Sequence, residues 1–344
     1  MVGETVFKFS LLKIPLAFLV LTLPFLLIIV SAGIGYIKIS PSEVLSVISA
    51  KIFGYDSEEL KKFETILFQI RLPRIILAAI VGCSLAVSGA VLQSMFRNPL
   101  VEPYILGISS GAAFGAALAL GFGAFGGAVQ LLAFAFGMLS VFLAYSMAKS
   151  GGEVPVVNLV LAGIIVSALF SALTSLVKFF VEPHQLAGIV YWIMGSFSYA
   201  TWSSIATITP PIALSLILIF AMGWRLNVLS LSDEEAKALG VNVNRDRFFA
   251  LFLSTLITAC AVSVSGIIGW IGLLIPHIVR LAFSSDNRIV IPLSAALGAS
   301  FMIVADDIAR TAFSFELPIS VLTTVLGAPV FMILVRRRAR RVWS

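Results

Sequence analysis

Charged residues are scarce in this chain. Asp, Glu, Lys and Arg make up 12% of its 344 residues, about half of their share in a soluble domain. Hydrophobic residues make up 60%, which leaves room for about ten membrane-spanning helices of about 20 residues each and little else. This composition excludes a soluble enzyme. It also excludes an outer-membrane barrel, whose strands alternate apolar and polar residues instead of forming long apolar runs.

Reactive side chains and nucleotide-binding motifs are also scarce. Cys83 and Cys260 lie inside apolar runs and fit neither a disulfide framework nor a Cys-x-x-Cys metal site. His184 and His277 stand apart, and neither a Gly-x-x-x-x-Gly-Lys-Ser/Thr loop nor a His-Glu-x-x-His pattern occurs. We therefore expect no catalytic residues, no metal site and no cofactor in this chain.

Basic residues outnumber acidic ones, 23 against 17, and give a net charge of +6. In a soluble protein this excess would suggest a nucleic-acid partner. Here the Lys and Arg residues flank apolar runs, and the positive-inside rule for membrane proteins explains that arrangement better. We expect a lipid bilayer, and no nucleic acid, around this protein.

Stretches free of Asp, Glu, Lys and Arg mark the spans, because a charge at the bilayer centre costs about 2.5 kcal/mol or more. These stretches are 14–37, 75–96, 103–148, 154–177, 183–224, 248–279, 289–305 and 317–335. Glycines divide 103–148 into two spans, and 248–279 holds one full span and one short one. In 183–224 we expect a short surface helix followed by a span over 201–223. The prediction is an all-α integral membrane protein, one transmembrane domain over 1–344, with about ten spans; eleven is the main alternative.

An even number of spans places both termini on one side of the membrane. The basic tail at 336–341 marks that side as cytoplasmic. On this topology most basic residues lie inside, and those outside are Lys38, Lys51, Lys61, Lys62, Arg71, Arg74, Lys178 and Arg310. The predicted location is the cytoplasmic (inner) cell membrane, crossed several times, with both termini in the cytoplasm.

A weak internal repeat emerges when the chain is shifted by about 177 residues. Cys83 then falls on Cys260, Ser88-Gly89 on Ser265-Gly266, and Pro99 on Pro276. The shift moves the second span onto the seventh, so the two halves would be inverted in the membrane, as in many transporters. Chance similarity between small-residue helices explains the matches about as well.

The polar loop 225–247 contains a predicted short helix. Ser232 is a suitable N-cap, Asp233, Glu234 and Glu235 favour the first turn, and Gly240 ends the helix. A solvated surface helix is the simple interpretation. The functional interpretation is a coupling helix, at about 230–241, that a cytoplasmic motor pushes.

Four further clusters occur in a fixed order along the chain. They are Arg71-Leu-Pro-Arg74; Gly82, Ser88-Gly89, Gln93, Arg97-Asn-Pro-Leu100, Glu102-Pro103 and Gly107-Ile-Ser-Ser-Gly111; Gly272-Leu-Leu-Ile-Pro276-His277-Ile-Val-Arg280; and Asp306-Asp307-Ile-Ala-Arg310 with Glu316-Leu-Pro318. In this order they resemble the FecCD family of binding-protein-dependent ABC importer permeases, over about residues 65–338. The chain departs from the family pattern at Glu102, where Asp is frequent, and at Ile267, where proline is usual.

The resemblance implies a bundle similar to the cobalamin-importer permease. It implies a dimer, most simply a homodimer, around a central path, with two ATPase subunits on the inner face and an extracytoplasmic binding protein on the outer face. ATP and magnesium belong to the ATPase, so this chain is not an enzyme. Matching the family pattern assigns the ATPase-coupling role to Asp233, Glu234, Glu235, Ala236, Leu239 and Gly240. It assigns the cytoplasmic gate to Asn98, Leu100, Val156 and Val157, and binding-protein docking to Arg71, Arg74 and Arg310.

Two other classes of protein compete with an importer permease. An ion-driven carrier usually needs an ionisable residue within the membrane, and the candidates here, Glu102, Asp306 and Asp307, lie near span ends. A membrane-embedded enzyme would need a nucleophile–base or metal constellation. Family frequency favours an iron–siderophore as the substrate; cobalamin, haem and an oxyanion such as molybdate are the alternatives.

Overall fold

The computed structural model describes residues 2–342 apart from 36, 38, 54–57 and 150–153, and of 2–12, 52, 58–60 and 334–342 it describes the backbone alone. Every regular element that it describes is helical. In chain order the α-helices are α1 Val2–Gly33, α2 Pro41–Phe53, α3 Glu58–Thr65, α4 Leu72–Met95, α5 Ile108–Gly121, α6 Gly127–Ala148, α7 Val156–Phe180, α8 Pro183–Ile193, α9 Trp202–Ala221, α10 Gly223–Leu229, α11 Asp233–Ala238, α12 Val243–Ser265, α13 Ile271–Ala282, α14 Asn287–Thr311 and α15 Ile319–Val342. A π-helical turn, η1 Ile66–Arg71, precedes α4, and a 3-10 turn, η2 Pro103–Leu106, precedes α5.

The apolar helices agree with the predicted spans. Among the described residues, seven helices are long and apolar enough to cross a membrane, and three shorter apolar helices are α5, α13 and the 319–333 part of α15. The stretch 103–148 divides into α5 and α6, and 248–279 into α12 and the short α13. Helix α8 is the predicted short helix ahead of the span α9. The all-helical membrane bundle is therefore confirmed, whereas the weak internal repeat stays a prediction.

A single helical segment runs from Lys61 to Met95 and contains the π turn. Within it, the backbone N–H of Leu72 donates to the carbonyl of Leu67, five residues earlier. Pro73 follows and has no N–H, so the helical ladder lacks one hydrogen bond at this point. Such a π turn shifts the side chains around it relative to a regular helix. Arg71 and Arg74 lie at this shift.

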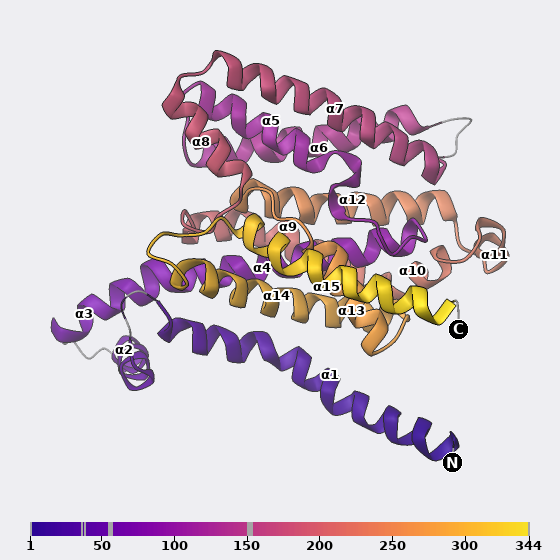
Figure 1. Cartoon of the computed structure of the whole chain (residues 1–344), viewed down its shortest axis with the longest axis horizontal. Helices are drawn as coiled ribbons and strands as arrows, with labels where there is room; N and C mark the ends of the chain where they lie inside the picture. The colour runs from indigo at the N-terminus through magenta and orange to yellow at the C-terminus, as the bar shows by residue number, and fades with distance from the viewer. Residues whose placement is uncertain (1, 36, 38, 54–57, 150–153, 343–344) are drawn as a thin grey trace.

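Helices α4, α12 and α14 form the centre of the bundle (Figure 1). About three quarters of the spans of α4 and α12, 78% and 72%, are buried, against 28% for α7. Glycines allow the inner helices to approach closely. A Cβ at Gly82 would lie 2.2 Å from the carbonyl oxygen of Gly298, and one at Gly89 would lie 1.8 Å from that of Gly272. These contacts join α4 directly to α14 and α13.

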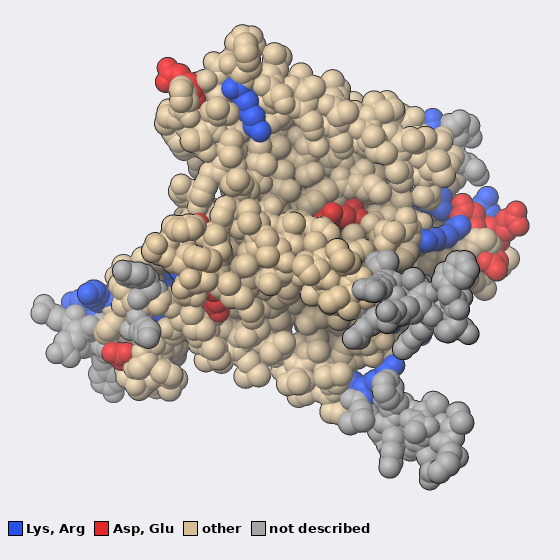
Figure 2. All heavy atoms as spheres, in the orientation of Figure 1, with Lys and Arg blue, Asp and Glu red and all other residues tan. Residues whose placement is uncertain are grey.

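The two ends of the long axis of the molecule differ in content. Helix α11, the N-terminal end of α1 and the C-terminal end of α15 lie at one end, and α2, α3 and α8 lie at the other (Figure 1). Most of the visible charged side chains gather at these two ends, and few lie between them (Figure 2). The bundle thus has the charge distribution of a protein that crosses a bilayer. The basic tail at 336–341 falls where only the backbone is described.

Candidate functional site

Helix α11, Asp233–Ala238, begins after the predicted N-cap Ser232 and lies within the predicted range of about 230–241. The N–H of Glu235 donates to Oγ of Ser232 at 3.2 Å, and Oε2 of Glu235 accepts from the N–H of Ser232 at 2.9 Å, which forms a capping box. Gly240 ends the segment with a φ of 78°. Ala236 is buried, whereas Glu234 and Leu239 are exposed. The helix therefore presents an acidic and apolar outer face on a small buried anchor.

Asp233 joins α11 to two other parts of the chain. Its Oδ1 accepts from Nη2 of Arg247, on α12, at 3.0 Å and forms an ion pair with Nη2 of Arg97, which follows α4. Partial burial acts to raise the pKa of Asp233, but the hydrogen bonds from Arg97 and Arg247 outweigh it and hold that pKa below its ordinary value. Reasoning from the sequence identified neither arginine as a partner of Asp233, although Arg97 stands beside the predicted gate residue Asn98.

The predicted gate residues lie at the same end of the molecule as α11. The loop after α4 and the start of α7 both reach that end (Figure 1). Oδ1 of Asn98 accepts from the N–H of Leu100 at 3.0 Å. Leu100 is 56% exposed and Val157 is 68% exposed, whereas Val156 is half-buried. The assignment of these four residues to a gate stays a prediction; their position at one end and their open apolar side chains fit it.

The exposed face of α7 is mostly apolar, but it also carries three polar side chains. Asn158, Ser171 and Ser175 are all exposed along this span. No Asp, Glu, Lys or Arg occurs between 154 and 177. Polar groups rarely face lipid within a span and usually face a water-filled path or another subunit. This face is therefore the candidate lining of a path.

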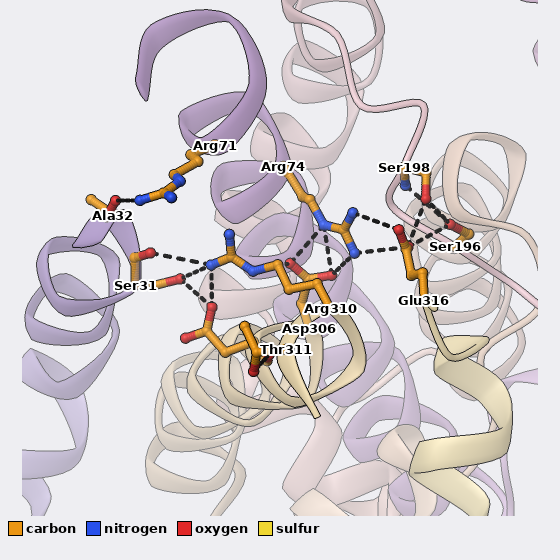
Figure 3. A network of polar contacts seen from close by, with 11 residues as sticks. Ser31, Ala32, Arg71, Arg74, Ser196, Ser198, Asp306, Arg310, Thr311 and Glu316 are labelled. Atoms are coloured by element: carbon orange, nitrogen blue, oxygen red, sulfur yellow. Dashed lines mark hydrogen bonds and ion pairs between the residues drawn. The ribbon is translucent and has the colours of Figure 1, made fainter. Parts of the chain in front are cut away.

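At the opposite end of the molecule, Arg74 is the centre of a buried ion network (Figure 3). Its Nη2 lies 2.7 Å from Oδ1 of Asp306 and 2.8 Å from Oε1 of Glu316. Ser198 Oγ donates to the same Glu316 oxygen at 2.6 Å, and Ser196 Oγ does so at 3.2 Å. Burial acts to raise the pKa of Glu316, but the hydrogen bonds from Arg74 and Ser198 outweigh it and lower that pKa. The network ties α4, α14 and the segments before α9 and α15 together.

Arg310 extends this network to α1, and Arg71 makes a separate contact with the same helix (Figure 3). Arg71 Nη1 donates to the carbonyl of Ala32 at 2.7 Å. Arg310 Nη2 donates to Oγ of Ser31 at 2.9 Å and forms an ion pair with Asp307. All three arginines predicted for docking thus have partners within their own chain, and Arg71 and Arg74 are buried. The docking role stays a prediction. The structure shows that these side chains bond helices of the same chain to one another.

The carboxylates that an ion-driven carrier would use are engaged in structural contacts. Asp306 and Asp307 pair with Arg74 and Arg310. Glu102 accepts the N–H of Trp270 at 2.6 Å and so holds the start of α13. The helical path is interrupted between α12 and α13 at Gly266, whose φ is 71°. The break therefore forms although Ile267 stands where the family usually has proline.

The bundle of apolar helices, the exposed face of α7 with its few polar side chains and the capped helix at one end are the features of a membrane permease. The FecCD transport family matches residues 22–337. The chain belongs to this family and is the permease subunit of an ABC transporter, separate from the ATPase. Membership implies a partner ATPase and a binding protein.

Several named permease proteins are similar over most of the chain. The molybdate import system permease protein MolB of Haemophilus influenzae is 39% identical over 91% of this chain and 92% of its own length. A probable iron chelatin transport system permease protein of Helicobacter pylori is 42% identical over 82% of this chain and 85% of its own length. The hemin transport system permease protein HmuU of Yersinia pestis is 39% identical over 79% of this chain and 84% of its own length.

A solved structure of a metal-chelate type ABC transporter in an inward-facing conformation superimposes on this bundle with a TM-score of 0.84. It is 37% identical, covering 94% of this chain and 99% of that chain.

Proposed function

We propose that this permease imports an iron chelate as a homodimer, with two ATPase subunits at the α11 end. The observation that supports a translocation path along α7 is its exposed face, where Asn158, Ser171 and Ser175 are exposed within a span. In a single chain these polar groups would face lipid. A second copy related by a two-fold axis would enclose them, and both copies would present the same face to the path.

The coupling proposal places the ATPase against α11. Glu234 and Leu239 are exposed and Ala236 anchors the helix, so a groove on a partner could receive the outer face of α11. Movement of α11 during the ATPase cycle would then open or close the gate at Asn98, Leu100, Val156 and Val157. This arrangement puts the α11 end, and with it both chain termini, in the cytoplasm, as the positive-inside rule also predicts.

The binding protein is proposed to dock at the end that carries Arg71, Arg74 and Arg310. The burial of Arg71 and Arg74 supports a specific form of this proposal. The arginines fix the positions of α1, α4 and α14, and the surface that these helices form receives the partner. On this account their substitution changes docking through the shape of the surface more than through lost charge.

For the substrate, the identity of 42% to an iron chelatin permease supports an iron chelate. The stretch 154–177 contains no charged residue, and such a lining suits a bulky complex whose metal is already wrapped by its chelator. Molybdate is the second candidate, because the molybdate permease MolB is 39% identical over 91% of the chain. A small anion such as molybdate would make few contacts with this uncharged stretch.

The substrate proposal is tested on the cognate binding protein and then on the whole complex. Ferric hydroxamate, hemin, cobalamin and molybdate are each added to the purified binding protein, and its melting temperature is measured. Binding raises the melting temperature with ligand concentration. We expect the ferric chelate to give the largest rise and to drive uptake into vesicles. A rise with molybdate alone would contradict the iron-chelate proposal and support the second candidate.

A further inference from the structure

The backbone at Arg97 has a conformation that glycine usually adopts. Helix α4 ends there in a Schellman arrangement: the N–H of Arg97 donates to the carbonyl of Ser94 at 3.3 Å, and the N–H of Asn98 to that of Gln93 at 3.1 Å. The φ of Arg97 is 52°, in the left-handed region, where a Cβ is disfavoured and glycine is common. An arginine at this position carries backbone strain that glycine would avoid, which points to a use for its side chain.

The side chain of Arg97 bonds to both ends of the turn that leads into α11. Its Nε donates to the carbonyl of Leu229, the last residue of α10, at 3.3 Å. Its Nη2 forms an ion pair with Oδ1 of Asp233, the first residue of α11. A guanidinium can make both bonds at once because its donors lie in one rigid plane. Arg97 thus links the last residue of α10 to the first residue of α11.

The residues after Arg97 form a stiff loop that includes the predicted gate residues. Oδ1 of Asn98 accepts from the N–H of Leu100 at 3.0 Å, and the carbonyl of Asn98 accepts from the N–H of Val101 at 3.3 Å. Val101 is buried, and its carbonyl accepts from Nε2 of Gln93 at 3.4 Å. A displacement of Arg97 therefore carries Asn98 and Leu100 with it.

We propose that the Arg97–Asp233 ion pair is the mechanical link through which movement of α11 reaches the Asn98–Leu100 loop. The inference rests on the proposed coupling role of α11 and on the proposed gate. Arg97 is a positioning residue. Arg247 supplies the fixed reference, because it is buried on α12 and bonds the same oxygen of Asp233 at 3.0 Å.

Arg97→Gly is the sharpest variant for testing the link. Glycine suits the left-handed backbone, so the end of α4 is expected to fold as well as before or better. The substitution removes both bonds to the α10–α11 turn. Substituting Asp233 is less informative, because it would leave the buried Arg247 without its carboxylate. The matched control is Arg288→Gln, which removes an exposed arginine in the first turn of α14 that pairs with Asp286, the N-cap of that helix.

The readout is the accessibility of the gate loop in the complete complex with its ATPase. A single cysteine is placed at Leu100 after Cys83→Ala and Cys260→Ala, and its rate of reaction with a membrane-impermeant maleimide is measured with and without ATP. We expect ATP to change this rate at least about threefold in the complex with native Arg97 and in the Arg288→Gln control. In Arg97→Gly the change is expected to vanish, while the ATPase still binds and hydrolyses ATP.

Two results would overturn the link. One is the same ATP-dependent change in Arg97→Gly as with native Arg97. The other is loss of ATPase binding in Arg97→Gly, which would mean that Arg97 shapes the docking surface of α11 and does not transmit movement. A reaction rate that does not respond to ATP even with native Arg97 would contradict the gate assignment itself. That result separates failure of the proposed function from failure of the link.

Discussion

Arg74 on α4 and Asp306 on α14 face each other 232 positions apart in sequence, with Nε 2.9 Å from both carboxylate oxygens and Nη2 2.7 Å from Oδ1. Both side chains are buried. A buried pair of this kind is costly to break, because removing one partner leaves the other charge unsolvated. The pair therefore fixes the relative position of two inner helices at the end of the bundle opposite α11.

Replacing Arg74 should destabilise the permease. We expect Arg74→Gln to cost about 3–5 kcal/mol, since Asp306 is left buried without its cation. The measurement is thermal unfolding of the purified permease in detergent, with Lys178→Gln as a control at another basic residue near that end. Equal melting temperatures for Arg74→Gln and the unmodified protein would show that the pair does not stabilise the bundle.

Acid should weaken the same network through Glu316. Its pKa lies below the ordinary value of 4.5 because bonds from Arg74 and Ser198 outweigh burial. A carboxylate with a depressed pKa in the folded state adds stability above its unfolded pKa, about 4.5, and that stability is lost as the pH falls through the folded pKa. Melting temperature measured from neutral to acid pH should therefore fall less in Glu316→Gln than in the unmodified protein. Parallel curves would exclude this contribution.

The close glycine contacts lead to a third prediction about stability. A Cβ at Gly89 would lie 1.8 Å from the carbonyl oxygen of Gly272, so Gly89→Ala must push α4 and α13 apart. We expect a loss of about 1–3 kcal/mol, as for other overpacked sites. Gly127→Ala is the control, because a Cβ there meets nothing within 4 Å. Thermal unfolding that ranks Gly127→Ala below Gly89→Ala would contradict the packing account.

The outer face of α11 can be tested without damage to its cap. Glu235 belongs to the capping box, so Glu235→Lys would also fray the helix. Glu234 is exposed and lies outside that box. Glu234→Lys should reduce the amount of ATPase that co-purifies with the permease, while its melting temperature stays unchanged. Normal co-purification and transport in Glu234→Lys would mean that the outer face of α11 is not the ATPase contact.

The sequence predicts the fold well because apolar runs and capping signals are local. The spans, the short α8 and the capped α11 all follow from residues within a few positions of one another. The break before α13 also forms as expected at Gly266, although Trp270, which directly precedes α13, has a positive φ as well, of 74°.

Long-range pairing is where reasoning from the sequence is insufficient. Arg71, Arg74 and Arg310 look like free outer charges in the sequence, yet their partners come from α1, α14 and the segment before α15. The Arg97–Asp233 pair likewise joins residues 136 positions apart. Charge sign and topology place such residues at the correct end of the bundle, but only the packing of the helices decides which of them meet.

The most direct test is to determine whether ATP or an ion gradient drives uptake. The permease, its ATPase and its binding protein are reconstituted into vesicles that contain ATP on the side of α11, and uptake of a radiolabelled ferric hydroxamate is measured with and without ionophores. We predict that uptake requires ATP and continues at the same rate when the proton and sodium gradients are abolished. Uptake that stops with the ion gradients while ATP is still present would contradict the account and favour an ion-driven carrier.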